Sequence, residues 1–132
     1  MSTLEMKFEI TSWDEKPYRE SPDGKWTRAE VTLAGTDPDG QLAEGAFESL
    51  MFYRADGTST YVSLMSLTGT LDGRHGTVVL AGEGTFDGTT ARGESRVIEA
   101  TGELRGLTGT ATSSSTHADY PFMPLTVTYD VG

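Results

Sequence analysis

The sequence contains no cysteine among its 132 residues. A disulfide framework, a thiol nucleophile and a cysteine-bound zinc or iron–sulfur site are therefore excluded. Basic residues are also scarce, because 10 Lys and Arg stand against 20 Asp and Glu, which gives a formal net charge of −10. Nucleic-acid backbones and anionic membranes attract clusters of Lys and Arg, so we expect neither as a partner.

Long apolar runs are missing as well. The chain does not open on a basic segment followed by an apolar stretch, and no run approaches the ~20 apolar residues of a membrane-spanning helix. We therefore expect no secretory signal, no transmembrane span and a cytoplasmic location. The length indicates a single domain over residues 1–132, large enough to form a core without disulfides or metal.

Asp-Gly pairs recur at nearly constant spacing and predict the architecture. They stand at 23–24, 39–40, 56–57, 72–73 and 87–88, and no window between them has helical periodicity. Gly provides the positive φ of a tight reversal, so each pair indicates a hairpin turn between long strands. The expected strands cover residues 4–12, 25–36, 41–53, 58–71, 74–86, 89–101, 107–116 and 122–131.

Eight antiparallel strands of this length favour an all-β, up-and-down barrel, with a flattened sandwich as the alternative. The interior of an eight-stranded barrel is either filled by side chains or holds one small ligand. In a meander, alternate connections share one end, which here brings together an aromatic-rich set: Trp13, Tyr18, His117, Tyr120 and Phe122. We expect the mouth of a cavity at this rim. The alternative is that these aromatic residues plug the barrel end.

The third strand leaves one question of register open. By hydrophobic pattern the odd residues from Phe47 to Tyr53 point inward and Glu48 is solvated. A four-residue loop over 37–40 and a two-residue Asp56-Gly57 turn would instead place Glu48 inside. A three-residue loop ending in Gly restores the first arrangement. If Glu48 faced the interior, desolvation would raise its pKa and let it act as a general acid or base.

In either register, apolar residues occupy both faces of the third and fourth strands. Leu50, Phe52 and Leu64 are the apolar residues that would lie outside the barrel if the odd face points inward. A homo-oligomer packed on this outer surface is the natural way to cover them.

Several ordered motifs resemble a family of small, mostly bacterial proteins of unknown function with the allene oxide cyclase-like β-barrel fold. They span nearly the whole chain: residues 8–15 with Pro17-Tyr18, then residues 50–58, 68–74, 84–88 and 102–109. The chain departs from the family pattern at Met65-Ser66, where a Glu-Arg pair is common, and at Ser95, where a Trp is common.

The resemblance implies that the protein acts without a cofactor. Barrels of this class include allene oxide cyclase, spirotetronate-forming cyclases and dirigent proteins, which hold a flexible apolar substrate inside the barrel. By similarity, Glu9 and Thr11 fall near polar interior residues of the first strand.

Metal binding is not expected. The two histidines, His75 and His117, fall at opposite ends of the expected barrel, and there is no cysteine to complete a site.

Three functions fit these observations. The first is a barrel that binds a small, largely apolar molecule through Met51, Tyr53, Tyr61 and Met65, with entry beside Trp13, Tyr18 and His117. The second is a cofactor-free cyclase or isomerase for a flexible apolar substrate of natural-product or oxylipin type, with Glu48 or Glu9 as the catalytic group. The third is a solid-cored structural or partner-binding protein.

Overall fold

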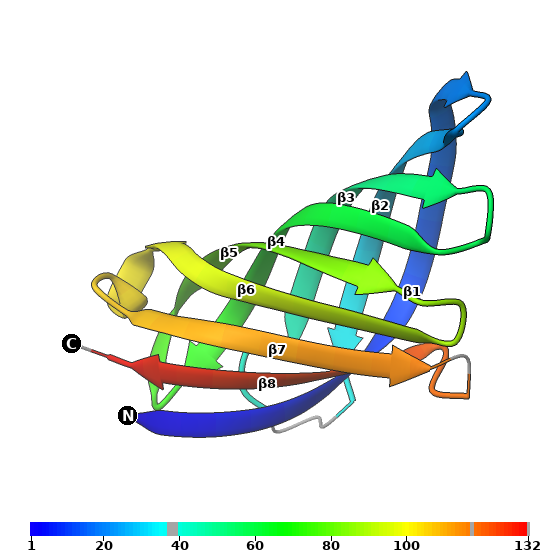
Figure 1. The fold of residues 1–132 in the computed structure, drawn as a ribbon. Coiled ribbons are helices and arrows are strands. Elements are labelled where there is room, and N and C mark those ends of the chain that lie inside the picture. The colour runs from blue at the N-terminus through cyan, green and yellow to red at the C-terminus, as the bar shows by residue number, and fades with distance from the viewer. Residues whose placement is uncertain (37–39, 117, 132) are drawn as a thin grey trace.

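A computed structural model describes residues 1–36, 40–116 and 118–131. Eight strands make up nearly all of this part of the chain (Figure 1). Their bounds are β1 Ser2–Ser21, β2 Gly24–Gly35, β3 Glu44–Arg54, β4 Ser59–Leu71, β5 Arg74–Phe86, β6 Thr90–Ala100, β7 Thr108–Thr116 and β8 Phe122–Asp130. One short 3₁₀ helix, η1 (Gly102–Leu104), connects β6 to β7, and no helix in the described ranges is long and apolar enough to span a membrane.

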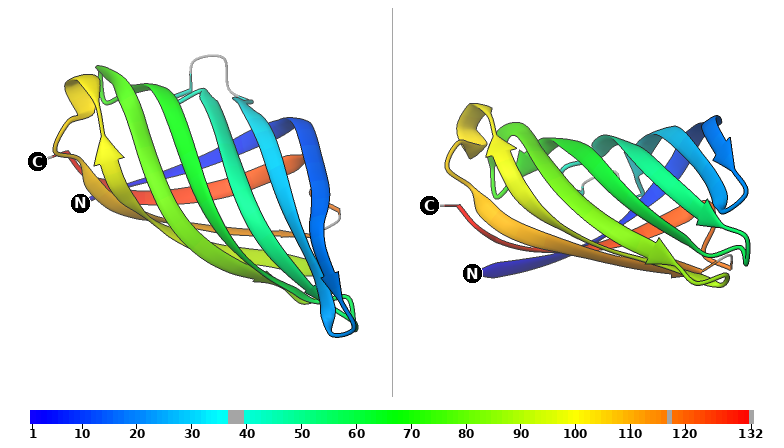
Figure 2. Two further views of the ribbon diagram at one scale, coloured as in Figure 1. Left: turned by 90° about the horizontal axis from the view of Figure 1, so that it is seen from above. Right: turned by 45° about the horizontal axis from the view of Figure 1, so that its top comes forward.

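Each strand pairs antiparallel with its sequence neighbours, and β8 returns to β1, so the sheet closes into a barrel. The steeply tilted strands wrap around a common axis (Figure 2). The all-β, eight-stranded antiparallel fold is therefore confirmed. Most predicted strand ends agree within three residues, but β1 continues to Ser21 where a long loop was expected after residue 12.

The connection between β3 and β4 resolves the question of register. Tyr53 pairs with Ser59, and Ala55, Asp56 and Gly57 form a three-residue loop that ends in a glycine with a φ of +89°. Because an odd residue pairs with an odd residue, the odd residues of both strands share one face, and the burial of Ser49 and Met51 shows that this face is the barrel interior. The interior position for Glu48 is wrong: its side chain lies outside, where Oε1 accepts a hydrogen bond from Arg28 at 2.9 Å.

A bulge in β1 changes which residues of that strand face inward. Ile10 pairs with Leu33, but Ser12 pairs with Thr32, so Thr11 is the extra residue. Before the bulge the even residues Phe8 and Ile10 face the interior, and after it the odd residues do. Trp13 and Glu15 therefore point to the same side as the core.

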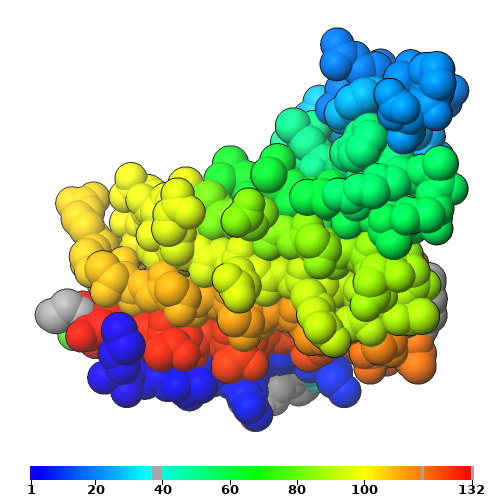
Figure 3. Space-filling model, in the orientation of Figure 1, coloured from blue at the N-terminus to red at the C-terminus, as the bar shows by residue number. Residues whose placement is uncertain are grey.

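The packed core fills the end of the barrel that carries the β4–β5 turn and η1. Its fully buried members include Phe8, Leu42, Leu67, Leu71, Leu80 and Leu104. At the opposite end the β1–β2 hairpin projects beyond the body of the molecule (Figure 3). The turns β3–β4 and β5–β6 lie at this same end, as a meander requires (Figure 1).

Candidate functional site

A cavity of about 380 Å³ lies inside the barrel, between the packed core and the projecting hairpin. Five of the predicted ligand-binding residues line it: Trp13, Met51, Tyr53, Tyr61 and Met65. Tyr120 and Phe122 from the β7–β8 connection also contribute to its wall, as expected for the rim. The cavity therefore opens at the end of the barrel that the aromatic pattern indicated.

Three other predicted site residues do not reach the cavity. Tyr18 is exposed beside a second irregularity of β1 near the hairpin tip and is not part of the cavity wall. Glu9, like Glu48, is exposed, because it alternates with the inward-facing Phe8 and Ile10. Neither glutamate is placed to exchange a proton with a molecule in the cavity. His117 lies outside the described residues.

The register of the sheet arranges the inward side chains of β3 to β7 in successive rows. The innermost row pairs Phe47 with Met65 and is apolar. The next contains Ser49, Ser63, Gly82 and Ser95, which pair in that order across four strands. Above it, Met51 pairs with Tyr61, and the outermost row pairs Tyr53 with Ser59. The cavity wall is thus largely apolar and aromatic, with a band of hydroxyl groups across it.

Tyr61 occupies space that two glycines leave open. A Cβ at Gly84 would lie 2.3 Å from the Tyr61 ring, and one at Gly93 would lie 2.8 Å from its hydroxyl oxygen. The hydroxyl donates to the carbonyl oxygen of Arg92 at 3.3 Å. Burial raises the pKa of Tyr61, so the phenol stays protonated in neutral solution. The two glycines therefore let Tyr61 lie flat against the wall of the barrel.

Glu15 was not predicted and is the carboxylate closest to the predicted binding residues. One of its oxygens accepts a hydrogen bond from the Trp13 indole nitrogen at 2.9 Å, and the other accepts one from the Thr27 hydroxyl at 2.9 Å. Burial, followed by the charge and hydrogen bonding of Glu15, raises the pKa of Tyr53 to about 12. Glu15 thus holds the Trp13 indole by a hydrogen bond and lies close enough to Tyr53 to raise the pKa of its phenol.

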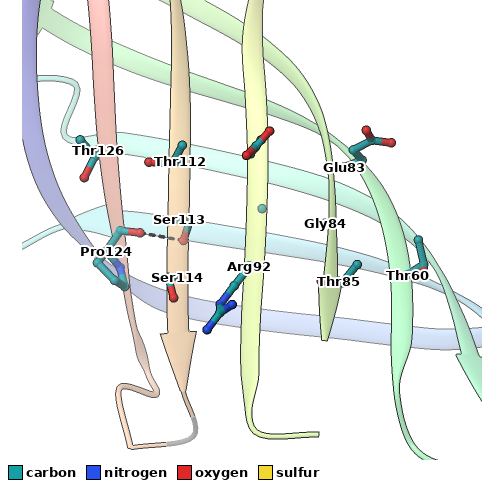
Figure 4. A pocket seen from close by; sticks show the side chains of 12 residues that line it. Thr60, Glu83, Gly84, Thr85, Arg92, Thr112, Ser113, Ser114, Pro124 and Thr126 are labelled. Atoms are coloured by element: carbon teal, nitrogen blue, oxygen red, sulfur yellow. Dashed lines mark hydrogen bonds between the residues drawn. The ribbon is translucent and has the colours of Figure 1, made fainter. Parts of the chain in front are cut away.

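A second hollow, of about 800 Å³, runs over β5 to β8 (Figure 4). It is larger than the interior cavity, but its side chains are mostly exposed and polar, including Thr85, Arg92, Thr112 and Ser114. Ser113, at its edge, donates to the carbonyl oxygen of Pro124 at 2.7 Å. Its wall mixes charged and hydroxyl side chains and offers a ligand less apolar surface than the wall of the interior cavity, so we favour the interior cavity as the binding site.

The outer face of β3 and β4 carries an apolar patch. Leu50, Val62 and Leu64 are about half exposed, with 47%, 52% and 53% of their surface accessible. Leu50 lies directly opposite Val62 on the neighbouring strand. Phe52 is partly covered, because its ring packs 4.7 Å from that of Trp26.

The described residues contain no group of three or more His, Asp or Glu side chains arranged to hold a metal ion. His75 is exposed near the β4–β5 turn, at the end of the barrel opposite the cavity mouth.

Comparison with known proteins agrees with this fold. The chain is similar to a solved protein of unknown function from Shewanella oneidensis MR-1, with a TM-score of 0.75 and 23% sequence identity over 98% of this chain and 97% of that one. None of the curated proteins matches. The model of the DUF3224 family, described as a protein of unknown function, matches residues 4–126. The chain therefore belongs to the DUF3224 family.

Proposed function

We propose that the protein binds one small, largely apolar molecule in the cavity inside the barrel. The observation that carries this proposal is the wall of that cavity, which combines Trp13, Phe47, Met51, Tyr61 and Met65 within a space of about 380 Å³. Pockets for small molecules are typically concave, mostly apolar and roughly 300–1,000 Å³ in volume. The resemblance to allene oxide cyclase-like barrels, which hold apolar substrates inside, supports the same location.

Binding is better supported than catalysis. A cofactor-free cyclase would use an ionisable group in the cavity, and Glu9 and Glu48 both lie on the outer face. Glu83 and Glu94 border the cavity, but both are exposed and alternate with the inward-facing residues of β5 and β6. Glu15 is close to the cavity, but its oxygens already accept hydrogen bonds from Trp13 and Thr27.

Native mass spectrometry of protein purified from its own cells tests the proposal. Ser115 and Ser114 are neighbours on β7, one in the cavity wall and one exposed on the outer face, so their phenylalanine variants form a matched pair. We expect the wild-type protein and S114F to carry an added small-molecule mass, and S115F to lose it. If S114F and S115F carried the added mass in equal amounts, the molecule would bind somewhere other than this cavity.

We also propose that two copies of the chain associate through the outer patch of Leu50, Val62 and Leu64. Each of these side chains exposes about half of its surface, Leu50 lies opposite Val62 across β3 and β4, and Leu64 lies on the same face of β4 opposite Glu48. Contiguous exposed apolar surface of this kind is typical of association sites.

A further inference from the structure

We propose that the polar group of the ligand is an uncharged hydroxyl or carbonyl, bound by the serine row Ser49, Ser63 and Ser95, and that the cavity discriminates against carboxylates. This inference rests on the proposed function and specifies the class of molecule that the cavity accepts. It follows from the position of the serines, from the state of their hydroxyl groups and from the charges around the cavity.

The serine row crosses the cavity wall at one level. Ser49 pairs with Ser63, Ser63 pairs with Gly82, and Gly82 pairs with Ser95, so these inward positions are consecutive around the barrel. A Cβ at Gly82 would lie 2.2 Å from the carbonyl oxygen of Glu94 and 2.6 Å from the Cβ of Ser95. The missing side chain therefore lets β5 and β6 approach and leaves space between Ser63 and Ser95.

The Ser49 hydroxyl is available to form a hydrogen bond with a ligand. Ser49 is only 4% exposed, and the structure shows no hydrogen-bond partner for its hydroxyl within the described ranges. In the same ranges, no fully enclosed side-chain oxygen or nitrogen is left without a partner. The Ser49 oxygen therefore keeps some open surface, and that surface faces the cavity that Ser49 lines. Ser59, which is 2% exposed in the outermost row, has the same properties.

A buried hydroxyl group gains most from a ligand that completes its hydrogen bonds. A serine hydroxyl donates one hydrogen bond and accepts others, so it matches a ligand hydroxyl or carbonyl equally well. The apolar row of Phe47 and Met65 lies on one side of the serine row, and Met51 with Tyr61 lies on the other. The ligand body would contact these side chains while its polar group meets the serines.

The charges around the cavity oppose an anion. Among the described residues that line it, none is Lys, Arg or His, and two exposed residues, Glu83 and Glu94, carry negative charge. The nearest inward carboxylate, Glu15, is negative and is hydrogen-bonded to Trp13 in the wall.

Two exposed lysines lie near the rim, with Lys25 Nζ 5.5 Å from the centre of the Tyr53 ring and Lys7 Nζ 5.6 Å from that of Phe122. A carboxylate bound deeper, at the serine row, would lose its hydration without a cation among the residues that line the cavity, which is costly. We therefore expect molecules with a free carboxylate, such as fatty acids and acidic oxylipins, to be poor ligands.

Three probes with one ring system test the inference by calorimetric titration: 1-naphthylmethanol, 1-naphthoate and 1-ethylnaphthalene. We expect 1-naphthylmethanol to bind about fivefold more tightly than 1-ethylnaphthalene, as one buried hydrogen bond predicts. We expect 1-naphthoate to bind at least about tenfold more weakly than 1-naphthylmethanol. In the S49A/S63A/S95A variant the advantage of the alcohol should disappear, while 1-ethylnaphthalene binds as before. S114A, altered on the outer face, is the matched control and should behave as wild type.

The outcomes separate this inference from the proposed function. If 1-ethylnaphthalene and 1-naphthylmethanol bind equally well to the wild-type protein, the cavity binds apolar molecules but the serine row does not select them. Tighter binding of 1-naphthoate would overturn the discrimination against anions. If none of the three probes binds, the proposed function itself fails.

Discussion

The hydroxyl of Tyr61 lies where the side chain of any residue larger than glycine would begin at position 93. A Cβ at Gly93 would be 2.8 Å from the Tyr61 oxygen but no closer than 3.6 Å to any other atom outside the neighbouring residues. The absence of a side chain on β6 and the orientation of an aromatic ring on β4 are therefore coupled.

The coupling predicts that removing the Tyr61 hydroxyl restores part of the stability that a side chain at position 93 costs. G93A should lower the free energy of unfolding by about 1–3 kcal/mol, the usual cost of overpacking, because the Tyr61 ring has to move. Y61F removes the clashing oxygen, so the double variant G93A/Y61F should recover at least about 1 kcal/mol relative to additivity. Urea denaturation of the four proteins measures this coupling. Strictly additive effects would show that the two positions are independent.

Glu15 should stabilise the rim by satisfying a buried hydroxyl. Thr27 is 2% exposed and donates to Glu15, so E15A leaves that hydroxyl without its acceptor. We expect E15A to destabilise the protein by about 1–3 kcal/mol. In a T27V background, where position 27 has no hydroxyl left to satisfy, the same substitution should cost clearly less. An equal cost in both backgrounds, measured by chemical denaturation, would assign the effect to Trp13 or to another contact.

Tyr53 should make stability depend on pH in alkaline solution. Its pKa is about 12 in the folded protein and 10.0 in an ordinary tyrosine, with burial as the first cause and Glu15 as the second. Between these values the folded state holds a proton that the unfolded chain releases, so stability falls as the pH rises. The contribution of Tyr53 is complete below pH 10 and is lost as the pH passes 12.

Two measurements check this dependence. Ultraviolet titration of the folded protein should contain a phenol component with a midpoint near pH 12 that Y53F lacks. The difference in urea midpoint between wild type and Y53F should be constant below pH 10 and should narrow or reverse above it. If Tyr53 titrated near pH 10 in the folded state, neither burial nor Glu15 would raise the pKa of its phenol in solution.

If two copies associate through the outer patch, a charged residue in the patch should separate them. L50E and L64E place carboxylates in the centre of the patch, so we expect both to convert a dimer to monomers in sedimentation equilibrium. T110E introduces the same charge at an exposed position on β7 and should leave the mass unchanged. A wild-type protein that is monomeric at high concentration, or variants that keep the wild-type mass, would contradict the proposed interface.

The sequence contains enough local information to predict most of the fold. Evenly spaced Asp-Gly turns and β-branched runs define the strands, and the meander order brings Trp13, Tyr53 and Tyr61 to one end. The orientation of Glu48 could not be derived, because Asp56-Gly57 fits both a two-residue and a three-residue loop, and one residue of difference reverses the face.

The role of Glu15 was missed for a related reason. Strict alternation from Phe8 and Ile10 would place Glu15 outside, and only the bulge at Thr11 brings it to the inner face. A bulge adds one residue without a distinctive sequence signal when no glycine marks it. The same extension of β1 carries Tyr18 away from the cavity, onto the projecting hairpin.

The methionines offer the most direct test of whether the cavity takes a ligand. Met51, Met65 and Met123 line it, whereas Met1 and Met6 do not. In a protein with ¹³C-labelled methionine methyl groups, titration with 1-naphthylmethanol should shift the signals of Met51, Met65 and Met123 and leave those of Met1 and Met6 in place. Five unchanged signals at saturating probe, or shifts confined to Met1 and Met6, would contradict a binding site inside the barrel.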